Sequence, residues 1–431
     1  MPHSRSLRRT SRYTGGRISA PETAGASSSR TVGSSGAGTG GLARLLASSW
    51  GFVLSVFLLS RAFFFVVGAV AVAALPQAEP AGDPLNPEGF LGYWANWDGA
   101  WYALISTEGY AARAPESTAF FPLYPMLLGL FVRLGGSVAF WGVLLSSLFT
   151  ALALFFLYAI AEKLFGIREA RFATLALAFF PTAFYLNAVY SEAPFLALSA
   201  GCFWAAYVRR DFLLAGVLGA FAAATRNLGV LLVLPLFFEW WRWRRDLGFR
   251  DLLFVGLVPA GLLAYAGYLW ARFGDPLLFA WQQGDYWGRT LTNPSVTAAA
   301  AWESAVVGAE YLTRPAALFL DGSPAASLAA SNALNLVTLA FLLVVLGAGF
   351  FVLPRGLSIM SAVMVLLPVL TPSPSFPLMS MPRFALGVFP VFLVLGFVLA
   401  RGRVLSYAWL VAGALLGAAL AALFVTWRWV A

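Results

Sequence analysis

Residues 48–75 read SSWGFVLSVFLLSRAFFFVVGAVAVAAL, a run long and apolar enough to cross a membrane as one helix. The rest of the chain has the same character. Of its 431 residues, 60% are hydrophobic and 11% are charged, and the mean hydropathy is +0.78. So few polar residues cannot cover the surface of a soluble protein of this size. The sequence therefore predicts an all-α, polytopic membrane protein.

Residues 1–46 precede this run and differ from it in composition. They are rich in Ser, Gly and Thr, and they contain seven arginines but one acid, Glu22. A segment without an apolar period predicts a disordered basic tail. The tail is too long for a cleaved signal peptide, so the first span is expected to remain, with the N-terminus in the cytoplasm. The transmembrane domain is expected to occupy 47–431.

The formal net charge of +9 does not indicate a nucleic-acid-binding protein. All basic residues except Lys163 are arginines scattered between apolar runs, and they form no basic helix face. In a membrane protein the distribution of such charges indicates which loops face the cytoplasm. The single cysteine, Cys202, lies in an apolar run and the single histidine, His3, lies in the tail. A disulfide framework, a zinc cluster and a catalytic histidine are therefore excluded.

The side of the membrane that the later loops face depends on the segment 119–134. This segment has about 16 residues and contains Pro122 and Pro125. If it crossed the membrane, twelve later basic residues would face outside. If it is a juxtamembrane or re-entrant helix, all twelve face the cytoplasm, in accordance with the positive-inside rule. We therefore predict the second arrangement. The twelve residues are Lys163, Arg168, Arg171, Arg209, Arg210, Arg242, Arg244, Arg245, Arg250, Arg355, Arg401 and Arg403.

This arrangement predicts about eleven membrane spans and two long outer loops, 76–137 and 272–333. Cytoplasmic links are short, so any chemistry is expected on the outer side. The two spans that flank Arg226 are too short for a ~30 Å core, and 212–238 is either one span or two half-helices. The expected spans are 48–75, 138–160, 172–190, 193–208, 212–225, 227–238, 252–271, 334–353, 357–371, 384–400 and 404–427.

The first outer loop contains a carboxylate among aromatic rings, because residues 93–102 read YWANWDGAWY. Read as a helix, the segment places Trp94, Trp97, Trp101 and Ile105 in one stripe. Asp98 falls inside this stripe and not on the opposite face. An unpaired charge beside apolar surface is costly, so such a residue is usually paired, protonated or used. The alternative is an interfacial aromatic anchor whose carboxylate reaches water.

Five sequence blocks follow one another between about residues 48 and 400. The first contains Asn96–Tyr102, Ile105, Gly109-Tyr110 and Ala119–Pro125. The others are Phe180–Phe184 with Tyr190–Glu192, then Thr225–Gly229, then Gly274–Leu277 with Trp281-Gln282 and Trp287–Arg289, and finally Pro382–Phe384. In this order the blocks resemble the PIG-V family of GPI mannosyltransferases and their bacterial relatives. The family signature is W-D-x-x-x-[YF], then G-Y, then A-F-F-P-x-Y-P.

The resemblance implies the GT-C glycosyltransferase fold and an inverting transfer of a sugar, usually mannose, from a polyprenyl phosphate. It implies Asp98 as the general base toward the acceptor hydroxyl, on the outer side of the plasma membrane. The departing lipid phosphate needs cations, and Arg suits bidentate phosphate contacts. The candidates, which the charge distribution places at or near the outer face, are Arg226, Arg289 and Arg383.

The same blocks contain the residues predicted to contact the substrates: Trp97, Tyr102, Glu192, Asn227, Gln282 and Trp287. Structural alternatives exist for several candidates. Glu192 could only complement the dipole of a helix that it begins, and Arg383 and Trp287 could lie at the membrane interface. Arg226 interrupts an apolar run, at a cost of ~2.5 to 3.5 kcal/mol if it lies at the bilayer centre. That cost favours a function for Arg226.

The sequence predicts no obligatory metal and no cofactor. Some GT-C enzymes carry an Asp-x-Asp pair in the first loop, but here Asn96 precedes the Trp-Asp pair, and one carboxylate makes a poor divalent site. The expected partners are a polyprenyl-phosphate-sugar donor, a lipid or glycan acceptor and membrane lipids. The composition suggests a bacterial chain, for which a GPI acceptor is not expected.

Two alternatives stay open. One is a sugar other than mannose, because no feature of the sequence identifies an epimer. The other is a transporter or flippase of polyprenyl-linked lipids without enzymatic activity. Transporters tend to have charges at mid-span and interrupted helices in two related halves. This chain has one interruption and concentrates its polar groups in two outer loops, which favours the enzyme.

Overall fold

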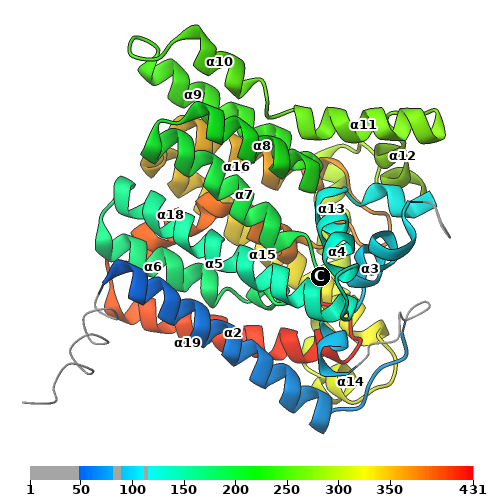
Figure 1. Cartoon of the computed structure of the whole chain (residues 1–431). Coiled ribbons are helices and arrows are strands. Elements are labelled where there is room, and N and C mark those ends of the chain that lie inside the picture. Colours follow the sequence, from blue (N-terminus) through cyan, green and yellow to red (C-terminus); the bar gives the residue numbers. More distant parts are fainter. Residues whose placement is uncertain (1–47, 81–88, 111–114, 431) are drawn as a thin grey trace, which may run out of the picture. The chain divides into compact units, whose positions relative to one another are not determined.

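The computed structural model describes residues 48–80, 89–110 and 115–430, which fold into helices and contain no strand (Figure 1). These residues belong to one unit, Leu45–Ala431. The prediction of an all-α polytopic membrane protein is confirmed. The tail predicted for 1–46 lies outside the described residues.

The α-helices, in chain order, are α2 (Ser49–Ala74), α3 (Asp98–Glu108), α4 (Leu123–Val132), α5 (Val138–Leu164), α6 (Ile167–Ala178), α7 (Glu192–Trp204), α8 (Phe212–Thr225), α9 (Val233–Trp243), α10 (Phe249–Val255), α11 (Ala260–Phe273), α12 (Leu278–Asp285), α13 (Pro294–Leu312), α14 (Pro315–Phe319), α15 (Ala325–Val352), α16 (Arg355–Leu370), α17 (Met381–Gly387), α18 (Phe389–Leu399) and α19 (Arg403–Val425). Five short 3₁₀ or π segments join them: η1 (Phe90–Ala95), η2 (Pro115–Ala119), η3 (Ala183–Leu186), η4 (Ala205–Arg209) and η5 (Asn227–Leu232).

Four of these helices, α2, α5, α15 and α19, are long and apolar enough to cross a membrane unaided. Two bent pairs, α10 with α11 at 46° and α17 with α18 at 85°, could each form a further span. By length and composition the described residues thus contain up to six spans, fewer than the eleven predicted. The difference arises because several apolar segments that were predicted as spans, among them α8 and α16, form helices too short for a ~30 Å core.

The span predicted for 172–190 is divided in the structure. Helix α6 ends at Ala178, and the turn η3 follows before α7 begins. Pro181 explains the break, because proline disfavours helical backbone at the preceding residue and cannot donate a helical hydrogen bond. Arg61 of α2 is buried beside the break and donates to the carbonyl oxygens of Ala178 (3.5 Å) and Ala183 (3.0 Å). The guanidinium thus satisfies carbonyls that the broken helix leaves without partners.

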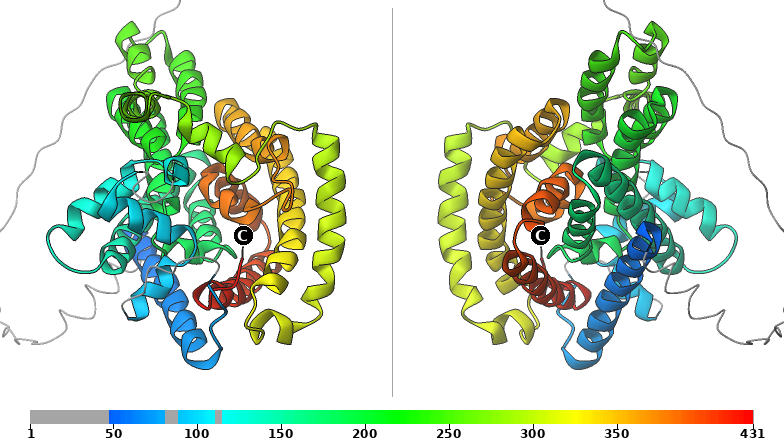
Figure 2. Two further views of the ribbon diagram at one scale, coloured as in Figure 1. Left: turned by 90° about the vertical axis from the view of Figure 1, so that its right-hand side faces the viewer. Right: turned by 90° about the vertical axis from the view of Figure 1, so that its left-hand side faces the viewer.

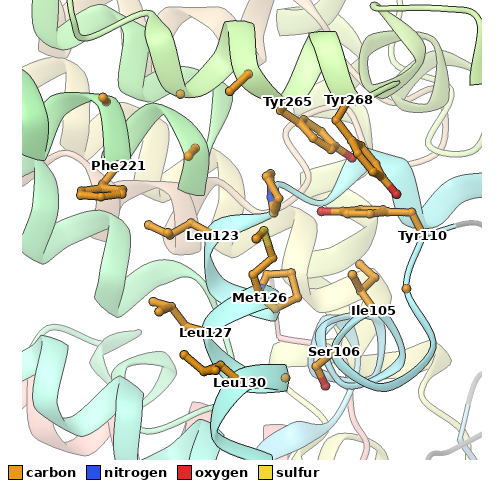
Figure 3. A pocket seen from close by; sticks show the side chains of 18 of the residues that line it. Ile105, Ser106, Tyr110, Leu123, Met126, Leu127, Leu130, Phe221, Tyr265 and Tyr268 are labelled. Atoms are coloured by element: carbon orange, nitrogen blue, oxygen red, sulfur yellow. The ribbon is translucent and has the colours of Figure 1, made fainter. Parts of the chain in front are cut away.

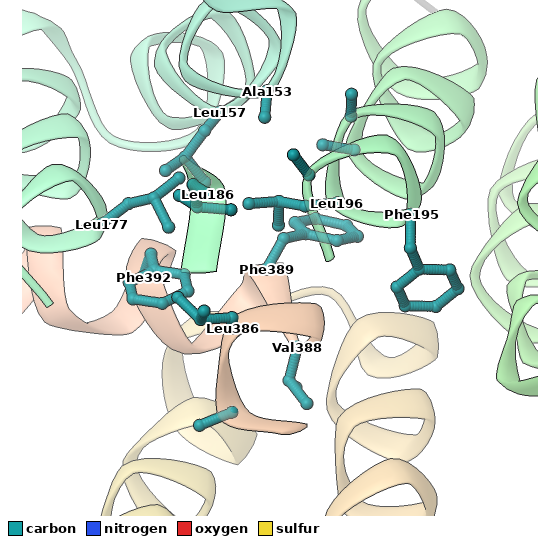
Figure 4. Packing of buried hydrophobic residues seen from close by; sticks show 14 of the residues in the cluster. Ala153, Leu157, Leu177, Leu186, Phe195, Leu196, Leu386, Val388, Phe389 and Phe392 are labelled. Carbon is teal, nitrogen blue, oxygen red and sulfur yellow. The ribbon is translucent and has the colours of Figure 1, made fainter. Parts of the chain in front are cut away.

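Helix α7 lies in the centre of the hydrophobic core. Residues 192–203 are all buried, as expected for a helix that is surrounded by other helices. Figure 4 shows the packing around its first turns, where apolar side chains of α5, α6, α7, α17 and α18 meet. They include Leu157, Leu177, Phe195, Leu196, Leu386, Val388, Phe389 and Phe392. The beginning of α7 is therefore held in a rigid setting.

The segment 76–137 contains the two short helices α3 and α4, as predicted for juxtamembrane helices. Helix α4 has 10 residues, about 15 Å, and does not span a bilayer. It approaches α3 closely because Gly129 has no side chain: a Cβ there would lie 2.5 Å from the carbonyl oxygen of Ser106. The segment 272–333 is also largely helical, and α13 runs beside α15 (Figure 2).

Candidate active site

Asp98 is the first residue of α3 and directly follows an unusual backbone conformation. Trp97 has φ 57° and ψ −121°, a region that bulky residues rarely adopt. Tyr190 supports this turn from the segment before α7. Its hydroxyl accepts a hydrogen bond from the Asp98 N–H (3.1 Å) and donates to the carbonyl oxygen of Asn96 (2.9 Å). The backbone on both sides of Trp97 is thus tied to one phenol.

This turn corrects the prediction of a single aromatic stripe. The turn η1 ends at Ala95 and α3 begins at Asp98, so Trp94 and Trp101 lie on different helical segments. Trp94 is buried and packs edge to face on Phe65 of α2, with ring centroids 5.2 Å apart. The prediction assumed a continuous helical period, whereas a local turn places the rings in separate environments.

Asp98 belongs to a chain of four alternating charges. Oδ2 of Asp98 accepts a hydrogen bond from Nη1 of Arg383 at 2.6 Å. Nε of Arg383 lies 3.0 Å from Oε1 of Glu192, and Nη2 of Arg226 lies 2.5 Å from the same oxygen. The order is Asp98, Arg383, Glu192, Arg226, and the formal charge of the four groups is zero. Four of the five sequence blocks meet at this point.

Burial differs along the charged chain. The Glu192 side chain is 0% exposed, whereas those of Arg383, Arg226 and Asp98 are 11%, 15% and 18% exposed. A buried carboxylate is stable as an ion only when cations and hydrogen bonds compensate it. Two guanidinium groups provide that compensation at Glu192. Asp98, the most exposed member, has one ion-pair partner among the described residues and is the group best placed to meet a ligand.

Ser191 connects the charged chain to Tyr102. Its hydroxyl accepts a hydrogen bond from Nε of Arg226 (2.9 Å) and lies 2.6 Å from the Tyr102 hydroxyl. Burial raises the pKa of Tyr102 to about 12, and the charge of Arg226 opposes this shift only in part. Tyr102 is therefore a neutral phenol at physiological pH. Glu192 also occupies the first turn of α7, so its carboxylate both pairs with arginines and complements the helix dipole.

Arg226 occupies the break that the sequence predicted. Helix α8 ends at Thr225, Arg226 has extended backbone (φ −154°, ψ 144°), and η5 begins at Asn227. The segment 212–238 is thus divided into α8 and the η5–α9 segment, and is not one continuous helix. The break lets the Arg226 side chain reach Glu192 and Ser191 on α7.

Arg289 lies beside the charged chain without joining it. Its guanidinium is 5.6 Å from the centre of the Phe384 ring, and that of Arg383 is 5.8 Å from the same ring. Arg289 donates to the carbonyl oxygens of Thr371 and Met379, both at 3.3 Å, and forms no ion pair with the described residues. Burial lowers the pKa of Arg289 to about 10, so the group remains charged at neutral pH. It is the cation of the site whose charge no carboxylate balances in the described part of the chain.

The other residues predicted to contact substrates are placed unevenly. The Trp287 ring packs on Phe120 (5.8 Å), which in turn contacts the Tyr102 ring (5.2 Å), so Trp287 forms part of the wall beside the site. Gln282 is buried in α12, and Asn227 is exposed next to Arg226. Neither is linked to the charged chain by a side-chain contact that the described residues show. Their roles, like those of the charged residues, stay predictions.

Trp97 has a different environment from the one predicted. Its ring packs against Trp427 and Trp429, with centroid distances of 5.7 and 4.9 Å. The predicted substrate contact of Trp97 remains untested, but its closest ring neighbours lie in the segment after α19. The last predicted span ended at 427, and no role was predicted for the triplet Trp427-Arg428-Trp429, which is visible in the sequence at the end of an apolar run. No role was predicted for Arg61 either, a lone charge inside the apolar run of α2.

A metal site is not evident in the described residues, which contain no group of three His, Cys, Asp or Glu side chains placed to hold an ion. The two carboxylates of the site, Asp98 and Glu192, are bridged by Arg383. The absence of an obligatory metal stays a prediction.

Residues 116–266 match the sequence model of the family described as dolichyl-phosphate-mannose-protein mannosyltransferase. The matched segment includes Glu192 and Arg226, and it ends before Arg383. No curated protein matches the sequence.

Solved structures show the relationship of the fold. The crystal structure of ArnT from Cupriavidus metallidurans bound to undecaprenyl phosphate is similar at a TM-score of 0.50 and 15% identity, over 85% of this chain and 63% of that chain. The crystal structure of ArnT from Cupriavidus metallidurans in the apo state has a TM-score of 0.48 and 16% identity, over 84% of this chain and 62% of that chain. A further similar structure is that of the oligosaccharyltransferase AglB from Archaeoglobus fulgidus in complex with an inhibitory peptide and a dolichol-phosphate. Its TM-score is 0.35 at 14% identity, over 89% of this chain and 55% of that chain. This chain thus spans less than two thirds of the length of these proteins. The helices described here have the GT-C glycosyltransferase fold.

Proposed function

We propose that the protein is an integral-membrane glycosyltransferase related to the PIG-V family. It transfers mannose, with inversion, from a polyprenyl-phosphate-linked donor to a lipid or glycan acceptor at the outer face of the plasma membrane. The observation that carries the proposal is the contact between Asp98 and Arg383 beside Arg289. It combines a partly exposed proton acceptor with cations for a phosphate. The family match of residues 116–266 supports the same class of reaction.

The proposed reaction is a single displacement. An acceptor hydroxyl gives its proton to the Asp98 carboxylate while its oxygen forms a bond to the anomeric carbon. The bond from that carbon to the phosphate oxygen breaks, and the polyprenyl phosphate leaves with the electron pair. The negative charge thus moves from Asp98 to the leaving phosphate. A general base of this kind typically contributes ~10²- to 10⁴-fold in rate.

Arg383 links the two ends of this charge movement. While Arg383 pairs with Asp98, its guanidinium occupies one oxygen of the carboxylate. A donor phosphate bound beside Arg383 would compete for the same guanidinium, and the competition grows as the leaving group gains charge. Donor binding would therefore draw Arg383 toward the phosphate and free an oxygen of the Asp98 carboxylate for the acceptor hydroxyl. We therefore expect the donor to bind before the acceptor is activated.

The three arginines have unequal roles in the proposal. Arg226 is held by Glu192 and Ser191, so it supports the site more than it offers free charge. Arg383 shares its charge between Asp98 and Glu192. Arg289 donates to backbone carbonyls alone among the described residues, so its positive charge is available for a phosphate. We place the donor phosphate between Arg289 and Arg383, with Arg226 as the more distant third cation.

A mostly apolar cavity of about 950 Å³ lies next to α3 (Figure 3). Asp98, Glu192, Arg226 and Arg383 do not line it. Its walls come from α3, α4, α8 and α11; Tyr110, Tyr265 and Tyr268 gather at one end, and Leu123, Leu127, Leu130 and Phe221 line another part. Ile105 and Ser106 of α3 also line it, about 10 Å along the helix from Asp98. The cavity suits the isoprenoid chain of a donor whose phosphate lies at Arg289. The undecaprenyl phosphate bound to ArnT, which shares the fold, supports this class of lipid.

A donor comparison in reconstituted vesicles tests the function. The purified protein would be supplied with polyprenyl phosphates that carry labelled mannose or labelled glucose, with GDP-mannose as a third donor, and with a lipid and glycan extract as the acceptor. We expect labelled product and free polyprenyl phosphate from the mannose donor. Transfer from glucose instead would correct the sugar, and transfer from GDP-mannose alone would overturn the lipid donor. Movement of the intact donor between leaflets without transfer would identify a flippase.

A further inference from the structure

The segment Phe424–Trp429, which comprises the last two residues of α19 and the four that follow, meets the residues directly before Asp98. Trp97 packs edge to face on Trp429, with centroids 4.9 Å apart and planes at 88°, and packs on Trp427 at 5.7 Å. The indole nitrogen of Trp97 is buried and has no hydrogen-bond partner in the described chain. Ring packing rather than a hydrogen bond therefore fixes this side chain.

A hydrogen bond next to Trp97 joins the same two segments. The Asn96 side chain is buried and donates from Nδ2 to the carbonyl oxygen of Phe424 at 3.0 Å. Trp97 itself has φ 57°, and Trp427 on the other side of the contact has φ 62°. Such conformations in bulky residues persist only where the surroundings hold them. Two strained tryptophans thus stabilise each other across the contact.

Arg428 anchors the segment from behind. Its side chain is 1% exposed and donates to the carbonyl oxygens of Pro76 (2.8 Å), Thr426 (3.3 Å) and Asp321 (2.6 Å). The backbone N–H of Trp429 donates to Oγ of Ser327 (2.9 Å). These contacts join the segment to the chain after α2 and to the beginning of α15. In Figure 1 the red chain beyond α19 lies at the same end of the helices as α3 and α14.

We infer that Trp427, Arg428 and Trp429 are positioning residues for Asp98. The inference rests on the proposed function, in which Asp98 is the general base. Trp427 and Trp429 hold the ring of Trp97, and Trp97 sets the turn from which the Asp98 side chain reaches Arg383. None of the three touches the reacting groups in this scheme. A displacement of about 1 Å at a catalytic group can cost ~10²-fold in rate, so a loosened turn would be visible in kcat.

Trp429→Ala is the informative substitution, because it removes the ring and keeps the backbone hydrogen bond to Ser327. We expect kcat to fall roughly 10- to 100-fold, with the donor KM within about twofold of wild type. Trp429→Phe keeps an aromatic edge for Trp97 and should recover most of the rate. Trp302→Ala, at an exposed tryptophan of α13, is the matched control and should keep the wild-type kcat.

The decisive comparison repeats Trp429→Ala in the Asp98→Asn background. If Trp429 acts through Asp98, the second change costs nothing further, because there is no base left to position. An equal fold-loss in both backgrounds would show a general structural role and overturn the inference. So would a wild-type kcat in Trp429→Ala.

Folding and function are separated by two measurements. Thermal unfolding of each variant detects general destabilisation. If Trp429→Ala does not fold, Trp429→Leu, which keeps apolar volume but has no aromatic ring, decides in its place: a smaller loss of kcat in the Asp98→Asn background supports the inference, and an equal loss overturns it. Asp98→Asn alone tests the proposed function. Wild-type turnover in that variant would refute Asp98 as the base, whatever the result at Trp429.

Discussion

Arg383 and Asp98 form an ion pair with a 2.6 Å contact although 285 positions separate them in the sequence. The same arginine lies 3.0 Å from Glu192, so one guanidinium serves both carboxylates of the site. The pair explains why a carboxylate persists among aromatic rings: its charge is compensated and its environment is not simply apolar. In the proposed reaction, a donor phosphate would compete with Asp98 for this guanidinium.

Asp98→Asn should abolish sugar transfer while donor binding survives. The amide keeps the size of the side chain but cannot accept the proton of the acceptor hydroxyl. We expect no more than about 1% of the wild-type rate, measured with a labelled polyprenyl-phosphate-sugar donor in vesicles. Asp246→Asn makes the same chemical change at an exposed position and serves as the control. Full turnover by Asp98→Asn would return this residue to the role of an interfacial anchor.

Arg289→Gln should weaken donor use more selectively than Arg226→Gln. Arg289 forms no ion pair in the described chain, so its loss leaves Asp98, Arg383, Glu192 and Arg226 in balance. We expect the donor KM to rise roughly tenfold, with unchanged thermal stability, and Arg289→Lys to recover part of the loss. The pKa of about 10 keeps Arg289 charged across neutral pH, so its effect on KM should be constant from about pH 6 to 8. Equal donor KM values in the Gln variant and the wild type would remove Arg289 from the phosphate site.

Glu192→Gln should destabilise the fold. Glu192 is fully buried between Arg226 and Arg383, and its neutralisation leaves two guanidinium groups with one carboxylate. Breaking a buried ion pair typically costs about 3 to 5 kcal/mol in the free energy of unfolding. The double variant Glu192→Gln with Arg226→Gln restores the charge balance and should be less destabilised than the single variant. Thermal unfolding in detergent measures both, and a single variant as stable as wild type would contradict the prediction.

Topology can be tested by cysteine labelling in a Cys202→Ala background. Ser295, at the beginning of α13, and Arg168, in the first turn of α6, are both exposed in the structure. With an impermeant maleimide on intact cells, we expect Ser295→Cys to react and Arg168→Cys to react only after permeabilisation. Arg168 is preferred to Gly166, two positions earlier, whose φ of 116° disfavours a side chain. Labelling of Arg168→Cys from outside would reverse the proposed orientation.

The sequence identified the members of the site better than their contacts. Asp98, Tyr102, Glu192, Arg226 and Arg383 were each selected from short motifs, and the structure brings all five together. The number of membrane spans was predicted less accurately, at eleven against up to six in the described residues. Apolar composition shows that a segment avoids water, but it does not distinguish a membrane span from a short helix buried by its neighbours, as at α7 and α8.

Composition by itself determined the class of this protein, because a chain with so few polar residues must be covered by lipid. The position of Pro181 and the Thr225-Arg226-Asn227 interruption also determined local breaks, since backbone restrictions and buried charge act over a few residues. Only the tertiary structure decided which charges meet. Arg226 and Arg383 were both expected at phosphate, yet they share a carboxylate oxygen of Glu192. Of the three candidate arginines, Arg289 alone forms no ion pair with the described residues. Likewise, no local pattern joins Trp97 to Trp429. Such pairings depend on how helices far apart in the sequence pack together, and a local sequence pattern does not predict them.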